Sequence, residues 1–313
     1  MKYGKNRAST IFRLIGSIPK ILIGIKREKV WLRGFAAREG LHLVISDNRY
    51  GLVAPGICCI FMTHQLLIPT PFGGWADRLL QRINYRYIRH FSRCWVCDIK
   101  GPGSLAGGLS NPGWMPPVDT RYIGVLSRMG AGTADGGGAM EGRGADGEEP
   151  YVLAVLSGPE PQRSLLERSI LRQAGALSDR LVLVRGLPGG GSPLTNIPAT
   201  VRVYDHLPAA ELERMIAAAR LVIARSGYST VMDLARMGKR AVLIPTPGQT
   251  EQEYLGRYLA SKGWVVCMRQ NEFSLRGAIS ADQEFAPWPG FDDGERLRAE
   301  ISSVLAQVRA PVH

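Results

Sequence analysis

The order of apolar and polar positions predicts a chain of alternating strands and helices. In the first half, short apolar runs each end in polar residues, and helical segments lie between them, such as Trp75 to Phe91. A parallel strand that is buried on both faces needs nearly continuous apolarity, so these runs predict parallel strands. We expect them at 41–45, 58–62, 94–97 and 122–126.

The second half repeats this alternation more clearly. Five strand–helix alternations are typical of a doubly wound parallel sheet. The strands are expected at 151–156, 181–184, 201–204, 221–224 and 240–245, and the helices at about 162–174, 209–219, 228–237, 251–262 and 294–308.

A segment between the halves has no apolar period. Residues 129–150 are rich in Gly, Ala and acidic residues, which predicts a flexible linker or an exposed loop. The sequence therefore predicts an N-terminal domain over 1–128, the linker over 129–150, and a C-terminal domain with a closing helix over 151–313. A length of 313 residues suits two domains.

Composition narrows the class of protein. A hydrophobic content of 45% is typical of a soluble globular chain. No apolar run is long enough to cross a bilayer and no signal-peptide pattern opens the chain, so we expect a cytoplasmic protein. The five cysteines do not form a secreted disulfide framework. Cys94 and Cys97 lack the second pair that a zinc site needs, and we interpret them as core residues.

The positive charge is concentrated near the start. The formal net charge is +12, and residues 1–39 hold ten Lys/Arg against two Glu, a difference of +8. Such a bias indicates an anionic partner. Aliphatic residues interleave with the basic ones between Phe12 and Ile25, which favours an anionic membrane surface, on the inner face of the plasma membrane, over nucleic acid. An amphipathic helix that covers a sheet is an equally good interpretation.

Candidate chemistry follows the predicted strands, because ligands of open parallel sheets bind beyond the carboxyl ends of the strands. The turn Ser157-Gly158 precedes a helix, where free N–H groups can face a phosphate, and Arg163 can add positive charge. Asp233 lies two turns into a later helix, placed to accept hydrogen bonds from a ribose diol. The other polar candidates at these strand ends are Arg185, Asp205, His206, Arg225, Ser226, Gly227, Ser229 and Thr230. Helix capping and packing are the alternative explanation.

A restrained Pro/Gly loop follows the last predicted strand. It leads into Thr250, Glu251, Gln252 and Glu253 at the start of a helix. Carboxylates there complement the helix dipole. Neighbouring Gln and Glu side chains also suit a sugar, because together they donate to and accept from hydroxyls.

These motifs resemble the donor-binding domain of glycosyltransferase family 28. The resemblance covers 151–268 and follows the order and spacing of 225–233, 238–245 and 251–254. It implies that Asp233 binds the ribose, that Gln252 and Glu253 contact the sugar, and that the turn at Ser157 faces the diphosphate. A well-known activity of the family adds N-acetylglucosamine to a lipid-linked peptidoglycan precursor.

The N-terminal half resembles uncharacterised bacterial relatives of the same family. The segments 46–51 and 61–66 carry this likeness. Such relatives begin with a strand and a glycine-rich loop that carries a histidine on the acceptor side. Nothing equivalent precedes Asp47, so we expect an α/β protein of two Rossmann-like domains facing a cleft, the GT-B type, with a shortened N-terminal acceptor domain.

The resemblance implies an inverting transfer of a hexosamine-type sugar, N-acetylglucosamine from UDP-N-acetylglucosamine, to a lipid-linked or cell-envelope glycan acceptor. No D-x-D motif ends a strand, so we expect no metal and no cofactor besides the UDP-sugar substrate. Inversion needs a general base. Asp47 and His64 are the candidates because both follow apolar strands, and His64 has the more suitable unperturbed pKa.

Two other classes of function remain open. A nucleotide-sugar epimerase or hydrolase can share this fold and donor site, because a fold does not fix a reaction. A non-catalytic donor-binding or membrane-recruiting subunit is the second alternative, since the expected opening loop is not found.

Overall fold

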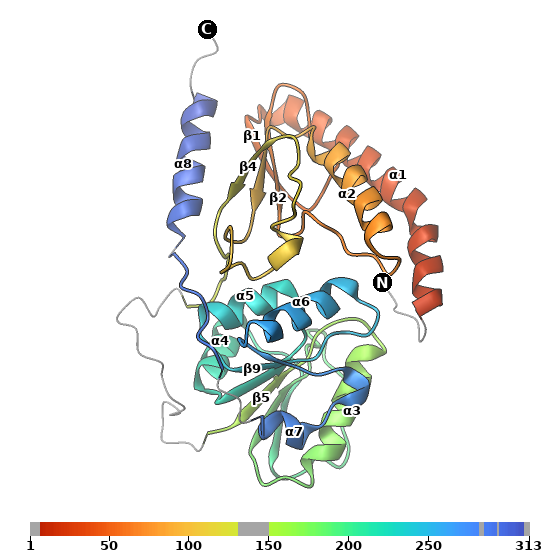
Figure 1. The fold of residues 1–313 in the computed structure, drawn as a ribbon, viewed down its shortest axis with the longest axis vertical. Helices are drawn as coiled ribbons and strands as arrows, with labels where there is room; N and C mark the ends of the chain where they lie inside the picture. Colours follow the sequence, from red (N-terminus) through yellow and green to blue (C-terminus); the bar gives the residue numbers. More distant parts are fainter. Residues whose placement is uncertain (1–6, 131–149, 282–284, 293, 310–313) are drawn as a thin grey trace. The chain divides into compact units, whose positions relative to one another are not determined.

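The computed structural model describes residues 7–130, 150–281, 285–292 and 294–309 (Figure 1). The chain divides into two compact units. Residues 6–126 and 290–313 form one, called the N-terminal unit below, and 127–289 belong to the other, the C-terminal unit. Most of the predicted linker, 131–149, lies outside the described residues.

The N-terminal unit contains a four-stranded parallel sheet in the order β1-β2-β3-β4. Phe61 and Cys94 face one side with Tyr85 and Ile88 of α2. The elements of this unit are α1 (Arg7–Glu39), β1 (Leu43–Asp47), β2 (Cys58–Thr63), α2 (Gly74–Ile88), β3 (Arg93–Val96), the 3-10 turn η1 (Gly107–Leu109), β4 (Asp119–Tyr122) and α8 (Glu295–Arg309).

The prediction of a strand at 122–126 is wrong. β4 covers Asp119–Tyr122 and its pairing with β3 ends at Tyr122. Gly124 takes a positive φ of 85°, which turns the chain out of the sheet directly after the buried Ile123. The apolar run therefore marks a buried exit from the strand and not the strand itself.

α1 is much longer than the apolar and basic stretch suggested, at 33 residues with Pro19 inside it. Glu28 fixes it to the loop after β1, because its carboxylate accepts hydrogen bonds from Arg49 Nη2 at 2.8 Å and from Gly51 N at 3.2 Å. Within the described ranges, no helix has the length and apolarity needed to cross a bilayer.

The C-terminal unit contains a six-stranded parallel sheet in the order β10-β9-β8-β5-β6-β7. The chain starts in the middle at β5, moves outward to β7, and returns to β8 on the other side, which creates a switch point between β5 and β8. Its elements are β5 (Val152–Val155), α3 (Gln162–Ala174), β6 (Leu181–Val184), β7 (Val201–Tyr204), α4 (Ala209–Ala218), β8 (Leu221–Ala224), α5 (Tyr228–Arg236), β9 (Ala241–Leu243), α6 (Thr250–Ser261), β10 (Val266–Cys267), η2 (Gln270–Glu272) and α7 (Leu275–Ile279).

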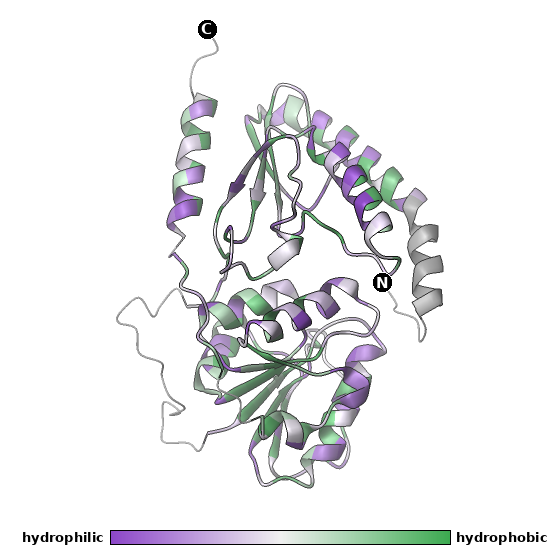
Figure 2. Ribbon diagram, viewed as in Figure 1, coloured by the Kyte–Doolittle hydropathy of each residue, from purple (hydrophilic) through white to green (hydrophobic). Residues whose placement is uncertain are grey.

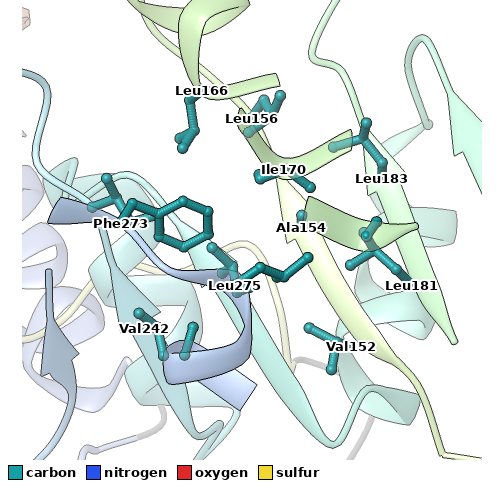
Figure 3. Packing of buried hydrophobic residues seen from close by; sticks show 14 of the residues in the cluster. Val152, Ala154, Leu156, Leu166, Ile170, Leu181, Leu183, Val242, Phe273 and Leu275 are labelled. Atoms are coloured by element: carbon teal, nitrogen blue, oxygen red, sulfur yellow. The ribbon is translucent and has the colours of Figure 1, made fainter. Parts of the chain in front are cut away.

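This unit confirms the doubly wound prediction, and its strands are largely apolar, with Arg202 of β7 as a charged exception (Figure 2). Side chains at alternate positions of β5 and β6 meet Leu166 and Ile170 of α3 and Phe273 (Figure 3). Burial of this cluster is the main source of stability for the sheet that carries the strand ends. β10 and α7 are additions that we did not predict.

The closing helix α8 belongs to the N-terminal unit and not, as expected, to the C-terminal one. α8 packs on the N-terminal sheet, where Val304 is 1% exposed and lies in one cluster with Ile60 and Trp95. Arg93 Nη1 also donates to Glu300 Oε2 at 3.3 Å. The expected domain over 151–313 therefore differs from the compact unit, which ends at Pro289. An amphipathic pattern predicts a helix but does not name the sheet that it covers.

Candidate functional site

The carboxyl ends of β5, β8 and β9 bring three polar positions together in the C-terminal unit. Gly158 follows β5, Arg225 follows β8, and Thr246 lies just beyond β9. Gly158 has a φ of 96°, and a Cβ on it would lie 3.6 Å from Thr246 Oγ1. The turn after β5 thus reaches across the end of β8 to the end of β9, which is the face where open parallel sheets bind ligands.

Arg225 holds these strand ends together. Its side chain is buried, and Nη1 donates to the carbonyl of Ile244 at 3.0 Å. Nη2 donates to the carbonyl of Gln162 at 2.8 Å and to Gln270 Oε1 at 2.6 Å. Burial lowers the pKa of Arg225 to about 10. Its hydrogen bonds go to the protein, so Arg225 shapes the site and supplies positive charge from behind it.

Arg163 and Arg185 are bound by carboxylates. Arg163 donates to Glu160 at 2.7 Å and to Glu167 at 2.8 Å. Arg185 donates to the same Glu167 at 2.8 Å and to Asp205 at 2.5 Å. Burial alone would raise the pKa of Glu167, but hydrogen bonds from Arg185 and Arg163 hold it below its ordinary value. These bonds use most of the donors of both guanidinium groups, including those of Arg163, whose charge we expected to serve a phosphate.

The start of α3 is also less suited to an anion than the sequence suggested. The N–H groups of Gln162 and Arg163 donate to the carbonyl of Pro159, at 3.1 and 3.3 Å. The N–H of Ser164 donates to the carboxylate of Glu160 at 3.3 Å. A phosphate at this helix end would find those N–H groups used and a negative charge beside it.

The start of α5 differs from that of α3 in the residues before it, which are Arg225 and Ser226 instead of an acidic residue such as Glu160. Its N-cap residue is Gly227, no side chain caps the helix, and its first turn contains no acidic residue. Ser229 is exposed there and Thr230 is half-buried. Ser226 does not face outward, since its hydroxyl donates to the carbonyl of Gln252 at 2.8 Å. An uncapped helix start with hydroxyl side chains is a suitable place for an anion.

Gln252 lies beside this helix start in a fixed orientation. Its Oε1 accepts a hydrogen bond from Thr246 N at 2.9 Å, so Nε2 must point the other way. A Cβ on Gly227 would lie 3.9 Å from Nε2. Gln252 therefore presents a donor, not an acceptor, toward the start of α5. Its neighbour Glu253 accepts from Gly248 N at 3.0 Å and so fixes the loop before α6.

The remaining candidates of this unit lie around the same edge. Asp233 is half-buried and accepts a hydrogen bond from the Ser127 hydroxyl at 2.7 Å. Burial raises its pKa. Asp205 also accepts from Gly191 N at 2.9 Å, whereas His206 is exposed. Thr250 and Glu251 begin α6 and are half-buried.

The two candidate bases lie at the ends of adjacent strands in the N-terminal unit. Asp47 ends β1, is exposed, and pairs in register with Met62 of β2. His64 follows β2 and is half-buried. The parallel pairing puts both residues at the same edge of this sheet.

Asp98 at the end of β3 is a residue whose role we did not predict. It is fully buried, and its carboxylate accepts hydrogen bonds from Ser104 and Ser110, both at 2.6 Å. Three backbone N–H groups donate to it as well. An acidic strand end before a loop rich in Ser and Gly is the signal that could have revealed it.

The cysteines have a structural character. Burial is the main reason that the pKa of Cys94 and that of Cys97 are raised to about 12, so neither is a ready thiolate. All five are free thiols. In the part of the chain that the structure describes, no group of His, Cys, Asp and Glu has an arrangement that can hold a metal ion.

Comparison with solved structures identifies the fold. A glycotransferase of kitacinnamycin matches with a TM-score of 0.60 and 16% identity, over 93% of this chain and 80% of that one. MurG of Acinetobacter baumannii matches with a TM-score of 0.50 and 14% identity, over 93% of this chain and 75% of that one. The protein has the fold of the GT-B glycosyltransferases.

Sequence comparison gives the family. Residues 197–284 match the glycosyltransferase family 28 C-terminal domain. The UDP-N-acetylglucosamine--N-acetylmuramyl-(pentapeptide) pyrophosphoryl-undecaprenol N-acetylglucosamine transferase of Methylobacterium sp. (strain 4-46) is 51% identical over 298 residues, which cover 87% of this chain and 71% of the relative. The chain belongs to glycosyltransferase family 28.

The coverage of other relatives is smaller. The enzyme of the same name from Rhodopseudomonas palustris (strain BisB5) is 28% identical over 174 residues, or 51% of this chain and 41% of the relative. That from Desulforudis audaxviator is 37% identical over 104 residues, 26% of its length. The chain thus spans less than half of the length of these relatives.

Proposed function

We propose that this protein transfers N-acetylglucosamine from UDP-N-acetylglucosamine to a lipid-linked or cell-envelope glycan acceptor, with inversion and without a metal. The observation that carries the proposal is the uncapped start of α5 with the fixed donor amide of Gln252 beside it. The activity for which the Methylobacterium relative is named supports the choice of sugar, nucleotide and lipid-linked acceptor.

In this reaction the acceptor hydroxyl attacks the anomeric carbon, and the bond from that carbon to the UDP oxygen breaks. Negative charge develops on the leaving diphosphate, which the positive end of α5 and the Nε2 donor of Gln252 would stabilise. The buried cation of Arg225 adds to that potential. His64, or in second place Asp47, would remove the proton of the acceptor hydroxyl.

The nucleotide would extend along α5. The carboxylate of Asp233 would accept hydrogen bonds from the ribose diol. Its present partner, the Ser127 hydroxyl at 2.7 Å, shows that a hydroxyl fits at this distance. Ser229 and Thr230 would donate to the phosphates, and Glu253 would face the sugar from the loop that it fixes.

UDP release separates this proposal from its alternatives. We would incubate the purified protein with UDP-N-acetylglucosamine, with and without lipid-linked acceptors. Release only with an acceptor supports transfer, release without one supports a hydrolase, and binding without turnover supports a donor-binding subunit.

A Gln252→Glu variant should lose about tenfold or more in donor affinity, because its second oxygen replaces the donor that faces Gly227. Wild-type affinity in this variant would contradict the assigned orientation.

We also propose that the N-terminal unit binds the anionic inner face of the plasma membrane. α2 exposes large apolar side chains every fourth residue, Trp75, Leu79 and Ile83, each next to an arginine in the sequence or one turn away. On α1 the exposed apolar residues are Ile21, Leu22, Ile23, Val30 and Trp31.

The helices α1 and α2 lie close together near His90, which follows α2. Burial lowers the pKa of His90, and the neighbouring Lys29 of α1 lowers it further. Apolar side chains among cations suit an anionic lipid interface.

Vesicle co-sedimentation tests this surface. Replacing Trp75, Leu79 and Ile83 together with serine should abolish most binding to anionic vesicles, because the apolar contacts with the lipid are removed. Replacing Ile301 and Leu305 of α8, which are exposed to a smaller degree, with serine is the matched control and should leave binding intact. Binding that depends on neither salt nor anionic lipid would refute the proposed membrane surface.

A further inference from the structure

Thr246 has a buried hydroxyl without a hydrogen-bond partner. The residue is completely buried beyond the end of β9, and its Oγ1 is one of a few buried side-chain polar atoms in the described ranges that lack a partner. A hydroxyl in this state destabilises the folded protein, and a valine would fill the same space without the penalty. Such a group therefore calls for a specific explanation.

The backbone of Thr246 is held on both sides. Its N–H donates to Gln252 Oε1 at 2.9 Å, and its carbonyl accepts from Gln249 N at 3.0 Å. The side chain is consequently fixed next to the turn at Gly158, where a Cβ would lie 3.6 Å from Oγ1. The hydroxyl therefore lies beside the turn that follows β5.

The surroundings of this hydroxyl favour an anion. Arg225 Nη1 also donates to the carbonyl of Pro245 at 3.3 Å, so a buried cation lies against the residue before Thr246. Gln252, which holds the Thr246 backbone, turns its donor amide toward Gly227 at the start of α5. A hydroxyl donor, an amide donor, a buried cation and a helix N-terminus therefore gather at neighbouring strand ends. The ligand that fits them is an oxyanion.

We propose that the Thr246 hydroxyl donates a hydrogen bond to a phosphate oxygen of the sugar nucleotide. This inference rests on the proposed function and adds a residue to its donor site. Because Oγ1 is closed off from solvent, a phosphate can reach it only when the atoms that cover it shift. Gly158 carries no side chain and occupies the left-handed region at a φ of 96°, so the backbone of this turn lies close to Thr246 without a Cβ between them.

The test compares two substitutions by calorimetric titration of the full chain with UDP and with uridine. Thr246→Val keeps the shape and removes the donor, and it should weaken UDP binding about tenfold. Uridine has no phosphate, so its affinity should not change. Thr246→Ser keeps the donor and should bind UDP within about twofold of the wild type. Thermal unfolding of the valine variant should show a midpoint no lower than that of the wild type, because an unpartnered polar group is gone.

Each other outcome overturns the assignment. Equal UDP affinity in the valine variant and the wild type would show that the hydroxyl does not touch the ligand. An equal loss with uridine would place the effect at the nucleoside. A loss in the serine variant as large as in the valine variant would make the effect one of packing. A wild-type chain that binds no UDP would overturn the proposed function as well, whereas the first three outcomes leave that function standing.

Discussion

Asp233 lies five residues after the first residue of α5, half-buried, with the Ser127 hydroxyl 2.7 Å from its Oδ1. Burial raises its pKa above the ordinary value of 3.8. At a pH between 3.8 and the raised pKa of the folded state, Asp233 has lost its proton in the unfolded chain but still holds it in the folded chain. The stability that this difference provides is therefore present below pH 3.8 and is lost as pH rises through the raised pKa.

Asp233→Asn should separate the binding and stability roles of this carboxylate. The variant removes the charged acceptor for the ribose, so affinity for UDP should fall roughly ten- to a hundredfold. It also removes the cost of the buried charge, so the variant should be more stable than the wild type at neutral pH. Urea unfolding as a function of pH measures this, and the gain should disappear as pH falls toward 3.8. A variant that is less stable at neutral pH would contradict the role of burial.

At the residue scale, the sequence predicted which strand ends carry polar groups but not which atoms remain available. Arg163 and Arg185 are of a residue type that binds phosphate, yet Glu167 forms ion pairs with both of them. The pair of Arg163 and Glu167 is one turn apart in α3, but the pair of Arg185 and Glu167 depends on α3 and β6 packing together, which no local pattern encodes. Thr246 stood within the Pro/Gly loop as an ordinary turn residue. Its importance depends on Gly158, 88 residues earlier in the chain.

The elements of the C-terminal unit were predictable because burial on both faces leaves strands apolar and helices periodic. The strands β6, β7 and β8 and the helix α3 agree with their predicted bounds. β10 has two residues, too few for any pattern. β4 fails for a different reason, because its residues are mostly half-buried or exposed while the buried residue, Ile123, comes after it.

The link between α3 and β6 supports a prediction on stability. Glu167 is 4% exposed and shared by two arginines. Glu167→Gln should lower the free energy of unfolding by about 3 kcal/mol, because it leaves buried guanidinium charge uncompensated. The contribution of Glu167 is present above its ordinary pKa of 4.5 and is lost as pH falls through its lowered native pKa. Chemical denaturation at neutral and acidic pH measures both effects.

An exposed acidic residue of the same unit provides the control. Glu272 is 60% exposed in its side chain and lies 3.5 Å from Arg269. Glu272→Gln should leave stability unchanged within about 0.5 kcal/mol. Equal losses in the two variants would mean that the network around Glu167 contributes no more than a surface pair.

At the scale of the whole molecule, the sequence predicted two parallel α/β units but assigned the last helix to the wrong sheet. The reason is physical. The apolar stripe of α8 specifies only that it must be covered, and both sheets have apolar faces. Long-range contacts such as Val304 with Trp95, and Arg93 with Glu300, determine that α8 covers the N-terminal sheet.

Val304→Ala tests this assignment. The cavity left beside Ile60 and Trp95 should cost about 2 kcal/mol. Hydrogen exchange should then show faster exchange in β2 and β3, with β5, β6 and β8 unchanged. Faster exchange confined to the C-terminal unit would instead restore the domain division expected from the sequence.

The return of α8 has a consequence for the order in which the protein can be made. Residues 127–289 leave the ribosome before the residues of α8, so the unit that carries the proposed donor site can complete its sheet while the earlier one still waits for its last helix. The N-terminal unit is a discontinuous domain, and the C-terminal unit is an insertion within it. During synthesis, the second half of the molecule is therefore able to fold first, and the exposed apolar face around Trp95 must be tolerated, or shielded by a chaperone, until translation reaches Val304.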